Sequence, residues 1–149
     1  MRPLYVLHDR LLEREKGDPH SNPAEPADHA FGRSRGGYGS KVHILTDASS
    51  IPLAIGVMAA QEHESKHVEA LLDQVWVPGK VGHPVQRARY VVGDKGYEGQ
   101  PVRQAIEARG GIPIIPKKSN QKAEYYVDKE LYRNRNMVER RIGWLAIRV

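Results

Sequence analysis

The side chains best suited to chemistry in this 149-residue sequence are Asp94 and one face of the last predicted helix. Asp94 directly follows the apolar residues 90–93, and a carboxylate at the carboxyl end of a strand is well placed to hold a hard divalent cation. Tyr132, Arg135 and Glu139 are spaced to share one face of a helix. Taken alone, the tripeptide Asp-Lys-Gly is typical of a turn, and a charged helix face is most often only solvated.

Asp94 and Glu139 together supply two of the three carboxylates that can hold a pair of Mg²⁺ ions about 3.5 to 4 Å apart. In phosphoryl transfer, such ions activate the attacking oxygen and stabilise the leaving one. The sequence therefore predicts metal-dependent chemistry on a phosphodiester, with Asp94 and Glu139 as the catalytic metal ligands.

A competing motif lies at residues 63–67, where His-Glu-Ser-Lys-His matches the H-E-x-x-H pattern of zinc metalloproteases. In that pattern two histidines one helical turn apart bind zinc, and the glutamate is the general base. Here His63 precedes Ser65, the expected N-cap of the next helix, so the helical phasing of His63 and His67 is doubtful. We expect both histidines to be solvated side chains at the helix start, and a zinc protease stays a minor alternative.

The composition is that of a basic chain without cysteine. Lys and Arg number 23 against 18 Asp and Glu, which gives a net charge of +5 and favours a polyanionic partner. Without cysteine the chain forms no disulfide framework and no cysteine-ligated zinc or iron–sulfur site. The longest run without strongly polar side chains, residues 51–60, is shorter than the about 20 apolar residues of a membrane span. We expect a cytoplasmic protein with no membrane contact.

The elements that must position these residues follow from the hydrophobic pattern. Apolar runs predict five strands, at residues 4–7, 41–46, 51–58, 90–93 and 112–115. Turn residues at 47–50 join the second and third strands into an antiparallel hairpin. Apolar spacing and capping residues predict three helices, beginning near residues 65, 101 and 128. This order predicts an α/β fold, a mixed sheet with helices packed on its faces.

The first part of the chain differs in composition from the rest. Residues 13–30 contain three prolines and almost no large apolar side chain, so they predict a loop. A glycine-rich segment with Arg33 and Arg35 follows, where the backbone can approach a ligand and guanidinium groups can bind phosphate. We expect residues 1–31 to be poorly structured and residues 32–149 to form the core of a single domain.

Four motifs, taken in chain order, carry a resemblance to a known family. They are Gly32-Arg33-Ser34-Arg35-Gly36-Gly37 through Lys41-Val42-His43, then Gly93-Asp94-Lys95-Gly96-Tyr97, Ile114-Ile115-Pro116, and Tyr132 through Arg135 to Glu139 and Arg140. This set resembles the C-terminal part of a bacterial insertion-sequence DDE transposase of the insertion-sequence-four/five type. The resemblance implies an RNase H-like catalytic core that performs DNA transposition by strand cleavage and transfer, with two Mg²⁺ or Mn²⁺ ions.

The resemblance also assigns roles to single residues. Asp94 would be the second acidic metal ligand and Glu139 the third, while Tyr132 and Arg135 belong to a Y-x-x-R-x-x-x-E signature that helps to hold DNA near the metals. The family's first aspartate has no counterpart on the strand at residues 4–7. Asp9 is close in sequence and Asp47 lies in the turn after the next strand, but neither matches the family position. Ala146 stands where the signature has lysine. We therefore expect an incomplete core, truncated at both ends and impaired in catalysis.

The resemblance implies DNA as the partner, both the ends of the insertion sequence and the target DNA. It leaves open whether the chain forms a homodimer, and it implies a location at the nucleoid. Basic side chains from separate loops and helices are expected to border the sheet edge and neutralise phosphates, so binding would depend on salt and little on sequence. The proposed DNA-binding residues are Arg33, Arg35, Lys41, Lys117, Lys118, Tyr132, Arg133, Arg135 and Arg140. A DNA-binding remnant without turnover, and a basic surface with no specific partner, are the alternatives.

Overall fold

The computed structural model describes residues 4–13, 32–34, 37–63, 65–76, 88–117 and 127–142. The strands are β1 (Leu4–Glu13), β2 (Gly32–Ser34), β3 (Gly37–Asp47), β4 (Pro52–Ala59), β5 (Tyr90–Val92) and β6 (Ile112–Ile114). The helices are α1 (Ser65–Gln74), α2 (Gln100–Ala108) and α3 (Lys129–Ile142), with a single 3₁₀ turn, η1, at Lys95–Tyr97.

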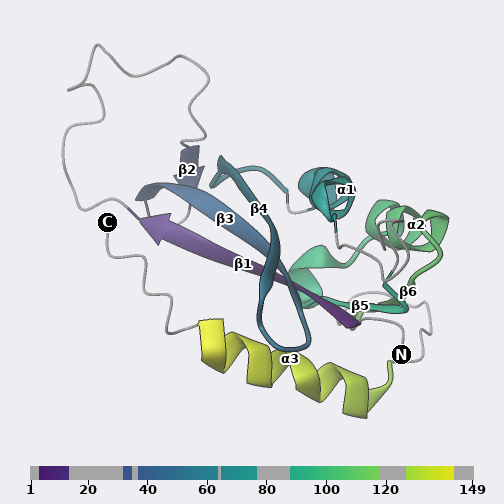
Figure 1. Cartoon of the computed structure of the whole chain (residues 1–149). Coiled ribbons are helices and arrows are strands. Elements are labelled where there is room, and N and C mark those ends of the chain that lie inside the picture. The colour runs from purple at the N-terminus through teal and green to yellow at the C-terminus, as the bar shows by residue number, and fades with distance from the viewer. Residues whose placement is uncertain are drawn as a thin grey trace.

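The described strands form one mixed sheet in the order β2-β3-β1-β5-β6, and β4 also pairs with β3 (Figure 1). β3 runs antiparallel to both β1 and β4, whereas β5 and β6 continue the sheet in parallel with β1. This arrangement confirms the predicted α/β class and the predicted hairpin. It also places β1 between an antiparallel and a parallel neighbour, in the middle of the sheet.

The expectation that residues 1–31 are poorly structured is wrong for β1. This strand is ten residues long rather than the predicted four, and Tyr5, Val6 and Leu7 are among the most buried side chains. The second half of β1 combines Leu11 and Leu12 with three charged residues and shows no strand-like alternation in the sequence, yet it pairs with β3 as far as Glu13. Backbone pairing extends the strand beyond the four predicted residues.

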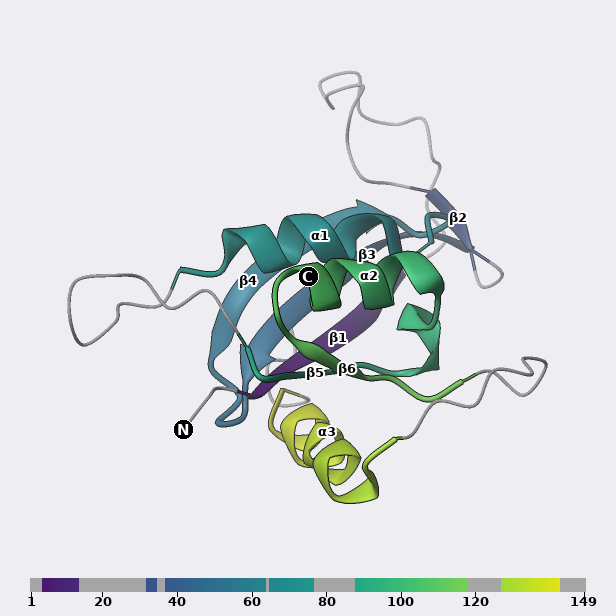
Figure 2. The ribbon, with the colours of Figure 1, turned by 90° about the vertical axis from the view of Figure 1, so that its right-hand side faces the viewer.

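Helices cover both faces of the sheet. α1 and α2 pack side by side on one face, and α3 lies on the other (Figure 2). The apolar positions of α1 predicted from their spacing, Val68, Leu71 and Leu72, are buried in the larger core on the α1 and α2 side. A second, smaller cluster of Val6, Val92 and Ile114 meets α3 on the opposite face. Alternate residues of β1 therefore face different layers.

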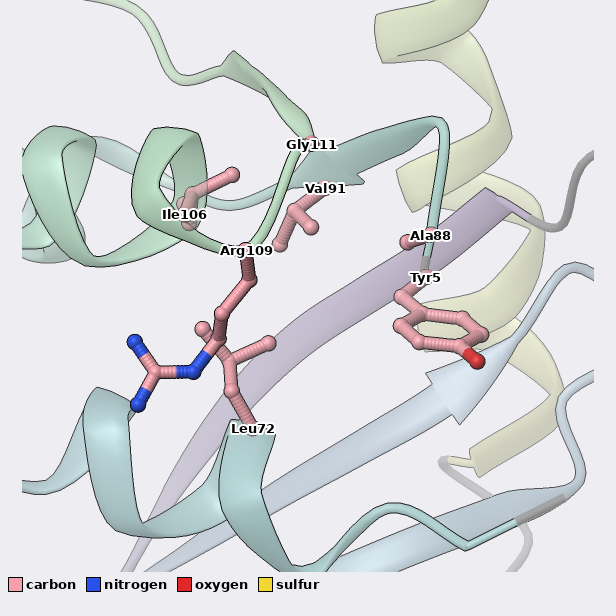
Figure 3. A pocket seen from close by; sticks show the side chains of 7 residues that line it. All are labelled: Tyr5, Leu72, Ala88, Val91, Ile106, Arg109 and Gly111. Carbon is pink, nitrogen blue, oxygen red and sulfur yellow. The ribbon is translucent and has the colours of Figure 1, made fainter. Parts of the chain in front are cut away.

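A small cavity in the larger core is lined by side chains from the sheet, α1 and α2 (Figure 3). Its volume is about 10 Å³, which leaves room for at most one water molecule. Arg109 closes one side and donates from Nε and Nη2 to Asp73 on α1, at 3.0 and 2.7 Å. The Arg109–Asp73 ion pair joins the end of α2 to α1, and the cavity beside it is too small for a ligand.

Tyr5, which lines this cavity, provides a test of the core. Its side chain is 1% exposed, its hydroxyl has no hydrogen-bond partner among the described residues, and burial together with Asp47 raises its pKa. We expect Tyr5→Phe to raise the free energy of unfolding by about 1 kcal/mol, because a buried hydroxyl without a partner is removed. Urea denaturation followed by circular dichroism at pH 7 measures this change.

The raised pKa of Tyr5 also sets a pH dependence. Above pH about 10 the unfolded chain loses the tyrosine proton while the folded chain keeps it, so the wild type loses stability as the pH rises through this range. Tyr5→Phe should lose less stability between pH 9 and pH 11 than the wild type does. If the free energy of unfolding fell equally with pH in the two proteins, Tyr5 would have the same pKa in the folded and the unfolded chain.

Candidate functional site

Asp94 begins the 3₁₀ turn that follows β5. Its Oδ1 accepts a hydrogen bond from the backbone N–H of Gly96 at 2.6 Å, which caps the turn. The other carboxylate oxygen, Oδ2, lies 3.9 Å from Nη2 of Arg135 on α3. The turn interpretation and the functional one are thus compatible, because one oxygen of Asp94 holds the loop and the second faces the helix.

Tyr97 fixes the far end of this turn in the core. Its ring is fully buried, and its hydroxyl lies 2.8 Å from Nδ1 of His43 on β3. The two rings meet edge to face, with their centroids 5.8 Å apart. The turn that carries Asp94 is therefore tied to the centre of the sheet through a contact that the sequence did not predict.

The helix α3 presents the predicted face toward Asp94. Nη1 of Arg135 donates to the Tyr132 hydroxyl at 3.0 Å, and Nη2 donates to Oε1 of Glu139 at 2.5 Å. Asp128 caps the start of the helix by accepting from the N–H groups of Glu130 and Leu131. The prediction that Tyr132, Arg135 and Glu139 project together is confirmed.

Arg135 is the positive charge between two carboxylates. Burial works against its charged form, but Tyr132, Glu139 and Asp94 outweigh that cost, so the pKa of Arg135 is raised. The Arg135 side chain is 19% exposed, against 32% for Asp94 and 39% for Glu139. The two carboxylates are accessible to solvent, and the guanidinium partly neutralises them.

His8 lies beside this group, and the sequence did not single it out. It sits two residues after Val6 on β1, and Val6 is the parallel partner of Val92, two residues before Asp94. Nδ1 of His8 is 4.0 Å from Oε1 of Glu139. Burial, and secondarily Arg135, lower the pKa of His8 to about 4, although Asp94 opposes this shift. At neutral pH the imidazole is therefore uncharged. We call His8, Asp94, Arg135 and Glu139 the Arg135 centre.

The other aspartates considered for the missing carboxylate lie elsewhere. Asp9 follows His8 on β1 and is the pairing partner of His43, so its side chain points to the opposite face of the sheet. Asp47 accepts hydrogen bonds from Ser49 and Ile51 in the hairpin turn. Neither completes a cluster with Asp94 and Glu139.

The charges of the Arg135 centre do not balance those of the expected pair of divalent ions. Two carboxylates supply two negative charges, of which Arg135 offsets one, and a pair of divalent ions carries four positive charges. In the present arrangement, no group of three histidine, aspartate or glutamate side chains among the described residues is placed to hold a metal ion. The Arg135 guanidinium ion-pairs with both carboxylates instead.

Only some of the predicted DNA-binding residues lie close to one another. Arg133 and Arg140 are exposed on α3, near Tyr132 and Arg135. Lys41 shares the opposite face of β3 with His43, and its Nζ lies 3.5 Å from the carbonyl oxygen of Glu62, so it is separated from α3 by the sheet. Lys117 is exposed, and Arg33 lies on the short strand β2. Arg35, Lys118 and the side chain of Arg33 lie outside the described part of the chain.

The H-E-x-x-H motif does not form a zinc site in the described residues. His63 precedes α1. Within α1, Nε2 of His67 lies 2.7 Å from Oε2 of Glu62. This bond lowers the pKa of Glu62. His67 also stacks on His43, with ring centroids 6.3 Å apart. Glu64 of the motif lies outside the described residues, as does Ala146.

Known proteins that resemble the chain are transposases. A sequence profile of the transposase DDE domain matches residues 15–147. A protein described as a transposase for insertion sequence element IS402 of Burkholderia cepacia is 35% identical over 145 residues, which make up 97% of this chain and 61% of that protein. A cryo-EM structure of a piggyBac transposase synaptic complex with hairpin DNA overlaps 80% of this chain and 24% of its own, with 14% identity and a TM-score of 0.48.

The fold and the site define an α/β protein in which a strand-end aspartate and a helix-borne glutamate meet on one face of a mixed sheet. That is the class of arrangement the motifs predicted. The chain belongs to the transposase DDE domain family, and the match covers most of its length. It spans 61% of the length of its insertion-sequence relative. Among the described helices, none is both long and apolar enough to cross a membrane.

Proposed function

We propose that this chain carries the DNA strand cleavage and transfer centre of an insertion-sequence transposase, with Asp94 and Glu139 as its acidic metal ligands. The observation that carries the proposal is their meeting across the sheet and α3 through Arg135. Residues far apart in the sequence supply two carboxylates on one accessible surface. A bound Mg²⁺ or Mn²⁺ would activate the attacking water or 3′-hydroxyl and stabilise the leaving oxygen.

The remaining residues of the centre would act on the DNA and on the carboxylates. Arg135 holds Glu139 and Tyr132 in fixed positions and would lower the cost of bringing a phosphate close to two carboxylates. Arg133 and Arg140, exposed on the same helix, would neutralise neighbouring phosphates. The DNA partner would be the ends and target of the element, on the bacterial nucleoid.

The second candidate is a DNA-binding protein without turnover. It is favoured by the Arg135 ion pairs, which offset the charge that a pair of divalent ions requires, and by His8 in place of a carboxylate near Asp94. Both candidates bind DNA, but only the first cleaves it.

The purified chain, incubated with supercoiled plasmid, tests the proposal. Parallel reactions contain Mg²⁺, Mn²⁺ or EDTA, and binding to a labelled duplex is measured in the same buffers. We expect slow nicking that requires a divalent ion. Binding without nicking would leave the second candidate, and a chain that neither binds nor nicks DNA would overturn both.

The arginines of α3 provide a separate prediction on binding. Replacing Arg133 and Arg140 together by glutamine removes two phosphate contacts, so the slope of log K against log salt should fall in magnitude by about 2. The matched control is Lys66→Gln with Arg109→Gln, which removes two charges from the α1 and α2 layer on the other face. If the α3 variant kept the wild-type slope, α3 would not face DNA.

A further inference from the structure

The strand β4 lies at the edge of the sheet on the side away from β5 and β6 (Figure 2). It pairs with β3 along one side, and no described strand pairs with its other side. An unpaired edge offers a row of backbone N–H and C=O groups to a further strand. Natural sheets block such edges with charged side chains or proline, but β4 has no charged residue, and Pro52 occupies only its first position. The edge of β4 is therefore open to pairing.

The side chains of β4 point alternately to the two faces of the sheet. Ala54 belongs to the larger core beneath α1, so Ile55 and Val57 point to the face that carries α3. Burial on this face ends at β4. Ile44, the β3 partner of Ile55, is 8% exposed, whereas Ile55 is 54% and Val57 56% exposed. Two β-branched apolar side chains thus stand in solvent beside an unpaired backbone edge.

The chemistry of this edge selects an apolar β-strand as its partner. DNA is held largely through phosphate contacts with cationic side chains, and β4 has none. A suitable partner offers an unpaired strand edge, apolar side chains at alternate positions, and no charge that the contact would bury. The β4 strand of a second copy meets all three requirements. Two copies can present it to each other at the same surface, as a two-fold contact requires.

Symmetry restricts how two copies of β4 can align. A two-fold axis perpendicular to the sheet makes the two strands antiparallel and keeps opposed side chains on the same face, so the numbers of opposed residues differ by an even number. The longest overlaps centre Ile55 or Gly56 on the axis. Only the second leaves Pro52, which has no N–H, outside the pairing. That register places Ile55 opposite Val57 of the second copy, and Ala54 opposite Met58.

We propose that the chain forms a two-fold dimer through β4, with Gly56 on the axis and Ile55 against Val57 of the second copy. The two sheets then become one, and both α3 faces lie on the same side of it. Five strand spacings of about 4.8 Å separate the two β1 strands, which places them about 24 Å apart, each beside its own Arg135 centre. The dimer goes beyond the proposed function and does not depend on it.

Sedimentation equilibrium of the purified, nuclease-treated chain tests the proposal. The runs span about 5 to 200 µM protein in about 0.5 M NaCl, which screens association through charges and through residual DNA. We expect a monomer–dimer equilibrium with a dissociation constant on the order of 10 µM, because a contact between single strands is small. A monomer at every concentration, or a dimer that salt dissociates, would overturn the proposal.

Charged substitutions at the edge locate the contact. Val57→Lys should weaken the dimer at least about tenfold, because pairing would bury a charge against the second copy. Trp76→Lys is the matched control, since it also places a charge at an exposed apolar side chain, here 65% exposed after α1. It should leave the dissociation constant unchanged. Equal effects of the two substitutions would place the contact outside β4.

A pair of double variants tests the register. Ile55→Lys with Val57→Glu puts opposite charges across the axis twice, whereas Ile55→Lys with Val57→Lys puts like charges there. The first should dimerise at least about fivefold more tightly than the second, because opposed charges on neighbouring strands attract and like charges repel. Equal dissociation constants would contradict the alignment centred on Gly56.

Hydrogen–deuterium exchange gives an answer on the wild type alone, should the variants fail to fold. Between about 5 and 200 µM protein, amides of β4 should become at least about threefold slower to exchange, because the second copy accepts their hydrogen bonds. Amides of β6, at the other end of the sheet, should exchange at the same rate at both concentrations. Slowing at β6 and not at β4 would overturn the proposal.

The plasmid assay is independent of this inference. A chain that nicks DNA but stays monomeric overturns the dimer and leaves the cleavage proposal standing. Dimerisation through β4 without nicking supports the dimer and overturns cleavage.

Discussion

Replacing Asp94 with asparagine is expected to reduce metal-dependent nicking of plasmid DNA to background. The amide oxygen can still accept the hydrogen bond from Gly96, so the turn should persist while the charge toward α3 is lost. Metal ions contribute several kcal/mol to phosphoryl transfer, and a centre with one remaining carboxylate should lose activity on the order of a thousandfold. Single-time-point gels and a full metal titration measure the effect.

Asp73 offers a matched control for this experiment. It too is an aspartate paired with an arginine, at 2.7 Å from Arg109, but it lies on α1 across the sheet from α3. Asp73→Asn should retain wild-type nicking and DNA affinity. Full activity in Asp94→Asn would place the chemistry outside the Arg135 centre, and equal losses in both variants would indicate a general effect of removing an ion pair.

Tyr97→Ala should be the most destabilising single substitution around the site, lowering the free energy of unfolding by about 4 kcal/mol. Truncating a buried aromatic ring removes apolar contacts and leaves a cavity, which together cost about 3 to 5 kcal/mol. Tyr97 is fully buried, and its hydroxyl contacts His43 on the neighbouring core strand. Urea denaturation followed by far-ultraviolet circular dichroism measures the change.

Two further variants separate the ring of Tyr97 from its hydroxyl. Tyr97→Phe keeps the packing and removes the contact with Nδ1 of His43, at a cost of about 1 to 2 kcal/mol. Trp76→Ala, which truncates an aromatic side chain that is 65% exposed, should change stability by less than about 0.5 kcal/mol. If Tyr97→Ala were as mild as Trp76→Ala, the turn that carries Asp94 would not depend on this anchor.

Local features of the sequence predicted a large part of the fold. The spacing of Val68, Leu71 and Leu72 correctly predicted the buried side of α1, because helical geometry alone decides which residues share a face. The same rule correctly grouped Tyr132, Arg135 and Glu139 on α3. Asp94 could be placed at the end of a strand because the apolar run before it is short and distinct.

The features that the sequence missed depend on contacts between distant segments. The second half of β1 mixes Leu11 and Leu12 with charged residues without strand-like alternation, and its strand conformation comes from pairing with β3. Lys41 was grouped with the α3 arginines on charge, but strand alternation directs it to the other face. The contact between His43 and Tyr97 joins two segments whose spacing has no local meaning.

The sequence by itself determined the family, through motifs spread along the chain, and the helix faces, through local spacing, and it singled out Asp94 and Glu139 as candidate carboxylates. Only the tertiary structure decided that Arg135 stands between those carboxylates and that His8 stands beside them. The physical reason is strand register. One parallel alignment of β1 with β5 fixes which residue of β1 lies next to Asp94, and a shift by one residue would turn His8 to the opposite face of the sheet.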